Sequence, residues 1–260
     1  MSGDGKILAA LAADGIAKQK MHVMMLVDTS RSMRGERIRQ VNEAIADIHK
    51  YLLNLQSENA NVDFYMSILT FSNEAVFLPG YKGVNVNDMT PPTLNCGGYS
   101  NLHCAYEKLG AAMQKESLGG MMPDFGGVAP IILLLTDGHP TKDSEKHLQT
   151  LKKLPWFKAA LRYGVAIELN DDRTMKVLED FTEDKDCVIS CFDASMLARI
   201  IQIIVMTASK VKSQNSVVNM NKSSVPKRGA KKVAASTSKV QCVVKQERHT
   251  TLAELDDWEW

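Results

Sequence analysis

Short apolar runs alternate along the chain with segments in which apolar residues recur every three or four positions, and stretches rich in Gly, Pro and Asp separate them. Short apolar runs between such stretches are typical of buried strands, whereas the longer period is typical of amphipathic helices. The alternation predicts a three-layer α/β fold, Rossmann-like, with a mostly parallel sheet between helices. We expect six strands, and the third is short enough to be an antiparallel edge strand. These strands cover residues 22–27, 62–71, 75–78, 129–136, 164–169 and 187–190.

Helical spacing follows the first expected strand and returns four more times. The apolar positions of the first helix are Ile38, Val41, Ile45, Ile48, Leu52 and Leu55. The later helices are expected over residues 102–113, 144–162, 173–182 and 194–210. Pro155 lies inside the third of these five helices, so we expect either a kink there or a new helix that begins at this proline. The stretch 79–98 is long and rich in Gly, Pro and Asn. We expect it to be a loop that carries or covers the functional edge of the sheet.

Oxygen-bearing side chains stand at every second position directly after the first apolar run. They are Asp28, Ser30 and Ser32. Carboxylate and hydroxyl oxygens without imidazole or thiolate suit Mg²⁺, Mn²⁺ or Ca²⁺. Because open α/β sheets place their sites at the carboxyl ends of parallel strands, we predict that this loop holds one divalent cation.

Two later segments also carry oxygen-bearing side chains. Residues 96–102 form a glycine turn that contains Ser100 and opens the next helical pattern, and a buried-strand run ends in Asp137. Asp-x-Ser-x-Ser, then a later Ser or Thr, then a strand ending in Thr-Asp-Gly resembles the metal-ion-dependent adhesion site of the von Willebrand factor type A family. The resemblance covers about residues 20–206. Over residues 28–38 the sequence looks most like bacterial intracellular members associated with tellurite-resistance and stress operons.

This resemblance implies a von Willebrand A domain with one divalent cation at the carboxyl edge of its sheet. Mg²⁺ is the best candidate because it keeps waters readily, and Mn²⁺ and Ca²⁺ are the alternatives. The ion would retain an open position for an Asp or Glu of a protein partner. The sequence departs from the family twice, since Arg31 stands where glycine is usual and Ser100 replaces threonine. The implied coordinating residues are Asp28, Ser30, Ser32, Ser100 and Asp137.

The resemblance also implies partners from the same operon, such as a protein kinase, a protein phosphatase or other stress-response components, with this chain as the adaptor. An adaptor subunit of an ATPase or chelatase-like machine is an alternative. A metal-dependent phosphatase or hydrolase is another, but a nucleophilic Asp28 would need a second acid two residues later, where Ser30 stands. No Gly-rich nucleotide-binding loop follows any expected strand. We therefore expect a binding protein and not an enzyme.

A purely local interpretation is that Asp28 caps a helix, the serines bond nearby backbone and Asp137 starts a turn. This interpretation gives no reason why oxygen-bearing side chains should stand at three separate strand ends. On the same face, Arg31, Tyr99 and His139 are candidate contacts for the partner.

Composition narrows the class of protein. The chain has 260 residues, of which 45% are hydrophobic, and a net charge of +1, which argues against a surface built for nucleic acid. The five cysteines are an odd number at spacings unlike structural zinc motifs, so we expect reduced thiols. No stretch of about twenty apolar residues occurs. We therefore expect no membrane insertion and a cytoplasmic location.

The composition changes after Lys210, where Ser, Lys, Val, Asn and Thr dominate and apolar periodicity ends. We expect an N-terminal extension over 1–20, the von Willebrand A domain over 21–208, a disordered basic Ser/Lys-rich tether over 209–248 and an acidic, Trp-containing docking peptide over 249–260.

The docking peptide has two expected uses. One face of a short amphipathic helix would enter a partner's groove through Leu252, Leu255, Trp258 and Trp260. Thr250 and Thr251 precede this face, and a phosphate there would dock an arginine-lined reader such as a forkhead-associated domain. A second hypothesis is that the acids of the same peptide mask the open position of the cation.

Overall fold

The computed structural model describes residues 18–58, 62–78, 83–124, 127–138, 140, 144–168 and 171–191. Most of the expected N-terminal extension, the helix expected over 194–210, the tether and the docking peptide lie outside these residues. Their expected boundaries therefore stay predictions.

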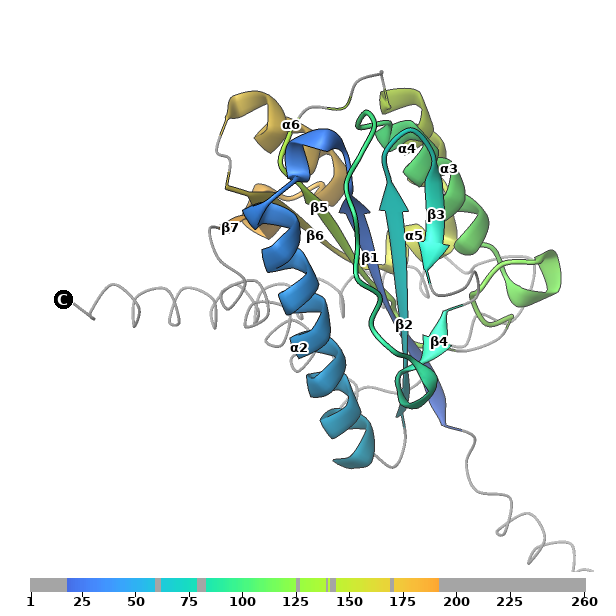
Figure 1. Cartoon of the computed structure of the whole chain (residues 1–260). Helices are drawn as coiled ribbons and strands as arrows, with labels where there is room; N and C mark the ends of the chain where they lie inside the picture. The colour runs from blue at the N-terminus through green and yellow to red at the C-terminus, as the bar shows by residue number, and fades with distance from the viewer. Residues whose placement is uncertain are drawn as a thin grey trace, which may run out of the picture.

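Within the described residues, seven strands form one sheet, in the order β3-β2-β1-β5-β6-β7, with β4 also paired to β2. The strands β1, β2, β5, β6 and β7 pair in parallel, and β3 and β4 run antiparallel to β2 (Figure 1). The mostly parallel sheet and its antiparallel edge strand are confirmed. The strands are β1 (Gln19–Asp28), β2 (Val62–Phe71), β3 (Ala75–Leu78), β4 (Val84–Asn85), β5 (Ile131–Thr136), β6 (Leu161–Ile167) and β7 (Val188–Cys191).

Helices cover both faces of the sheet. One core lies under α2, and a second core lies under α3, α4, α5 and α6, so the three-layer architecture is confirmed (Figure 1). The helices are α2 (Glu36–Glu58), α3 (Leu102–Ala112), α4 (Glu145–Leu151), α5 (Pro155–Ala159) and α6 (Asp172–Thr182). Short 3₁₀ turns lie at η1 (Arg31–Met33), η2 (Val86–Asp88), η3 (Glu116–Leu118) and η4 (Lys185–Cys187).

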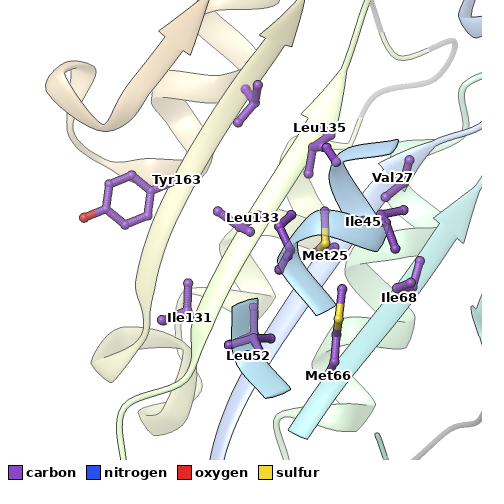
Figure 2. Close-up of a cluster of buried hydrophobic side chains, with 14 of the residues drawn as sticks. Met25, Val27, Ile45, Leu52, Met66, Ile68, Ile131, Leu133, Leu135 and Tyr163 are labelled. Carbon is purple, nitrogen blue, oxygen red and sulfur yellow. The ribbon is translucent and has the colours of Figure 1, made fainter. Parts of the chain in front are cut away.

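The central strand β1 is buried on both faces because successive side chains point to opposite sides of a strand. Met25 and Val27 join the core under α2, whereas Met24 and Leu26 join the core on the other side. Figure 2 shows Met25 and Val27 among side chains of α2, β2, β5 and β6. Each such side chain contributes about 1.5–3 kcal/mol when fully buried. This burial fixes where β1 ends, and so it fixes the position of Asp28.

The structure differs from the sequence prediction after Pro155. The chain does start a new helix there, with Pro155 in its first turn. The expected helix does not continue to residue 162, because Leu161 and Arg162 pair with β5 as the first residues of β6. Arg162 is buried in the sheet and its guanidinium donates to Phe181 O and to Glu183. Pairing with a neighbouring strand thus overrides the helical composition of this segment.

The stretch 79–98 is not simply a loop. It contains β4, a strand additional to the six that the sequence predicts. Two residues are too few to show a hydrophobic period. Side chains of α2 hold the following segment: His49 lies 2.8 Å from Val86 O, and Asn42 bonds the backbone of Leu94 through both its amide atoms. The end of the stretch, near Gly97, reaches the carboxyl end of β1, where Gly97 donates to Thr29 O.

None of the helices in the part of the chain that the structure describes has the length and apolar character needed to cross a membrane.

Candidate metal centre

Asp28 ends β1, and its side chain collects donors from three places in the chain. Its Oδ1 accepts the backbone N–H of Ser30 at 2.8 Å. Its Oδ2 accepts the hydroxyls of Ser100 and Thr136, each at 2.8 Å. The residue is 0% exposed. Burial raises the pKa of this carboxyl above its usual value, although the hydrogen bonds from Ser30, Ser100 and Thr136 oppose the shift.

Asp137, which directly follows β5, is linked to Ser32 and, through Ser32, to Ser30. Ser32 Oγ donates to Asp137 Oδ1 at 2.9 Å, and Ser30 Oγ lies 3.0 Å from Ser32 Oγ. The side chain of Asp137 is fully buried, whereas Ser32 is exposed. The structure therefore brings all five predicted residues to one edge of the sheet, within one connected set of hydrogen bonds.

A glycine turn places Ser100. Gly98 adopts a left-handed backbone conformation with φ of 82°, which favours glycine. Its carbonyl accepts the Arg31 N–H at 3.1 Å, and the next amide, that of Tyr99, donates to Asn73 Oδ1 at 2.9 Å. A Cβ on Gly98 would lie 2.7 Å from that Asn73 oxygen. The turn thus needs glycine to pack against the loop after β2 and to aim Ser100 at Asp28.

The donor chemistry fits a hard divalent cation. Within the described residues no group of three or more His, Cys, Asp or Glu is arranged to hold a metal. A cation at this edge would therefore rest on two carboxylates and three hydroxyls, a set of oxygen donors of the kind that Mg²⁺, Mn²⁺ and Ca²⁺ prefer. Coordination by these five residues stays a prediction.

Three contacting residues were missed by the sequence analysis. Thr136 donates to Asp28, and its signal is its place beside Asp137 at the end of a buried strand. Arg37 Nη1 donates to Asp137 Oδ2 at 2.5 Å, and Arg37 Nε donates to Glu168 Oε2 at 3.0 Å. Glu168 directly follows β6, so it is a third acid at a strand end.

The residues predicted to contact a partner are placed only in part. Arg31 is exposed in η1 beside the site, and Tyr99 is 67% exposed in the glycine turn. Their role stays a prediction. His139 lies outside the residues that the structure describes, as do Thr250, Thr251, Leu252, Leu255, Trp258 and Trp260.

Comparison with known proteins agrees with this architecture. Residues 23–140 match the family model of the von Willebrand factor type A domain. This part of the chain is therefore similar in sequence to a von Willebrand factor type A domain. No curated protein matches the chain.

Solved structures share the fold at low identity. Proximal thread matrix protein 1 from the mussel byssus is 16% identical, with a TM-score of 0.54 over 74% of this chain and 48% of that chain, and one of its structures has a zinc-occupied MIDAS motif. The pilus adhesin SpaC from Lactobacillus rhamnosus GG is 13% identical, with a TM-score of 0.54 over 75% and 31%. A von Willebrand factor type A structure from Catenulispora acidiphila is 14% identical, with a TM-score of 0.50 over 74% and 43%. The match thus spans less than half of each of these chains.

Proposed function

We propose that this domain is a metal-dependent protein–protein interaction module. Asp28, Ser30, Ser32, Ser100 and Asp137 would hold one divalent cation, and a carboxylate of a protein partner would fill its open position. The observation that carries the proposal is the convergence of Ser100 and Thr136 on one oxygen of Asp28, together with the contact of Ser32 with Asp137. Helix capping or a local turn would not require contacts among two strand ends and the turn before α3.

Mg²⁺ is the proposed ion, with Mn²⁺ and Ca²⁺ as alternatives. Hydroxyl and carboxylate oxygens suit all three, and Mg²⁺ most readily keeps waters in its shell. Zinc belongs among the ions to be tested, because it occupies the MIDAS motif in the mussel protein.

We further propose that the protein acts as an adaptor in the cytoplasm, within a stress-response or tellurite-resistance-type phosphosignalling system. It is supported by the resemblance of residues 28–38 to bacterial members of such systems. The partner would be a kinase, a phosphatase or a protein with a forkhead-associated domain.

We also propose that the domain is not an enzyme. Among the residues that the structure describes, the side chains that hydrogen-bond to Asp28 are hydroxyls, and those that hydrogen-bond to Asp137 are a serine and an arginine. Arginine stays protonated and hydroxyls are weak acids, so these contacts provide no group suited to proton transfer near neutral pH.

The test measures cation uptake and partner capture with the same variants of the full chain. Calorimetric titration with Mg²⁺ and Mn²⁺ should show one site in the wild type and none in Asp28→Ala. Asp47→Ala is the matched control, because Asp47 is an exposed acid on α2. Partner capture from the native cell should be lost with EDTA and with Asp28→Ala, and kept with Asp47→Ala.

A further variant tests the docking peptide. Trp258→Ala with Trp260→Ala in the full chain separates capture through the docking peptide from capture through the cation. Loss of the partner in the tail variant alone, with unchanged recovery in EDTA, would contradict the proposal. Absence of any cation uptake by the wild type would contradict it as well.

A further inference from the structure

One oxygen of the candidate metal centre already has a cationic partner. Arg37, in the first turn of α2, donates through Nη1 to Asp137 Oδ2 at 2.5 Å and to Ser32 O at 3.2 Å. The Asp137 side chain is fully buried, and that of Arg37 is 26% exposed. Asp137 therefore divides its two oxygens between Ser32, a predicted ligand, and a guanidinium.

Glu168 holds the other side of the same guanidinium. Its Oε2 accepts from Arg37 Nε at 3.0 Å, and its Oε1 accepts from Gln40 Nε2 at 3.2 Å. Both donors lie on α2, one turn apart, whereas Glu168 follows β6. The backbone of Glu168 is left-handed, with φ of 52°. Such a conformation costs a non-glycine residue about 1–3 kcal/mol and is kept where surrounding contacts enforce it.

We propose that Arg37 is a built-in counter-cation that competes with the divalent ion for Asp137, and that Glu168 sets the strength of this competition by holding the guanidinium from behind. The inference rests on the proposed function, since it concerns the affinity of the same site. Both residues act through Asp137, so they are positioning residues and not ligands.

The sign of each effect follows from charge. A divalent ion beside Asp137 would lie close to the fixed positive charge of Arg37, and like charges at short range repel. Removing that charge strengthens cation binding and frees the second oxygen of Asp137. Removing the charge of Glu168 leaves Arg37 with Asp137 as its remaining acidic partner among the described residues. Cation binding then weakens.

The test is calorimetric titration of Mn²⁺ and Mg²⁺ into four variants of the full chain. Arg37→Met should bind about tenfold tighter, since removing one adjacent like charge is worth about 1.4 kcal/mol. Glu168→Gln should bind about threefold weaker, because its charge acts from farther away. Arg37→Lys keeps the charge and should stay close to the wild type. Arg39→Met is the matched control, because Arg39 pairs with Glu36 and Glu43 on the exposed side of α2.

A second readout is urea unfolding in EDTA and in saturating Mn²⁺. Arg37→Met should be less stable than the wild type in EDTA, because the buried Asp137 loses its counter-charge, and it should gain more from Mn²⁺. Damage to the structure would weaken cation binding, so tighter binding by Arg37→Met cannot come from damage. Glu168→Gln is expected to bind the cation more weakly. Weaker or unchanged binding by Arg37→Met, with a wild type that binds normally, overturns the inference alone. A wild type that binds no cation overturns both proposals.

Discussion

Ser100 Oγ donates to Asp28 Oδ2 across 2.8 Å, although 72 positions separate the two residues in the chain. The contact forms because β1 ends at Asp28 and the glycine turn before α3 returns to the same edge of the sheet. Thr136 reaches the same oxygen from β5. A single buried carboxylate oxygen thus joins three distant segments. A substitution in any one of them should therefore alter the hydrogen bonding of the other two.

Thr136→Val should destabilise the domain by about 1–3 kcal/mol, because it leaves the buried Asp28 with one donor fewer. The shape of the side chain is conserved, so the loss reports the hydrogen bonds of the Thr136 hydroxyl, to Asp28 and to the backbone of Gly138. Urea unfolding at neutral pH measures it. Thr150→Val is the control, since the Thr150 hydroxyl bonds a carbonyl on the exposed side of α4. Equal stability of the two variants would show that the Thr136 hydroxyl contributes nothing.

Gly98→Ala should weaken both the fold and cation binding. The added Cβ would meet Asn73 at 2.7 Å in a backbone conformation that alanine rarely adopts. We expect a loss of about 1–3 kcal/mol in unfolding free energy and reduced Mn²⁺ affinity, since the turn that places Ser100 must shift.

Gly110→Ala is the contrasting variant. Gly110 lies in α3, and the closest atom to an added Cβ is 3.7 Å away. Alanine should therefore stabilise the helix by about 0.5–1 kcal/mol and leave cation binding unchanged. If both glycine variants lowered Mn²⁺ affinity equally, the special role of Gly98 would be wrong.

His22 should make stability fall as the pH falls from about 6.5 to about 4. Its pKa is lowered to about 4, chiefly by burial and also by the nearby Lys20, whereas Glu116 opposes the shift. Neither ring nitrogen has a hydrogen-bond partner among the described residues. In this window the unfolded chain binds a proton that the folded chain does not, so stability is present above the unfolded pKa and is lost toward the folded pKa.

The measurement compares wild type with His22→Leu by urea unfolding at pH 7 and pH 5. The wild type should lose about 2 kcal/mol more than the variant between these values, as linkage requires for a shift of this size. Identical losses in the two proteins would show that His22 does not titrate across this range.

Ile45→Ala should destabilise the domain by about 2–5 kcal/mol without changing the chemistry of the site. Ile45 is fully buried between α2 and the sheet, where Figure 2 shows it near Met25 and Ile68. Ala46→Gly would be a poor control because of its backbone effect, so Asp47→Ala on the exposed side serves instead. Mn²⁺ affinity, measured on folded protein, should remain that of the wild type.

The ends of the central strands could be predicted from the sequence, because a parallel strand buried on both faces is a continuous apolar run. A charged residue directly after such a run, as at Asp28 and Asp137, marks the strand end. The contacts of Arg37 could not be predicted in this way. They join α2 to the end of β6, and 131 positions separate Arg37 from Glu168 in the chain. Whether the two side chains meet in space depends on how the helix lies over the sheet.

Two other differences have local causes. The strand β4 has two residues, too few for any period to show. The segment around Leu161 is rich in good helix formers, yet its pairing with Ile131 places it in the sheet. In both places the deciding information lies in a neighbouring strand and not in the segment itself.

The oxygens of Ser100 and Thr136 already lie at hydrogen-bonding distance from Asp28. Hydroxyl groups can turn about their C–O bonds while their heavy atoms stay in place. Binding of an ion at the candidate metal centre would therefore require little rearrangement of the backbone. The speed of loading would then follow how fast the incoming ion sheds its own hydration water, which is slow for Mg²⁺ because that ion dehydrates reluctantly.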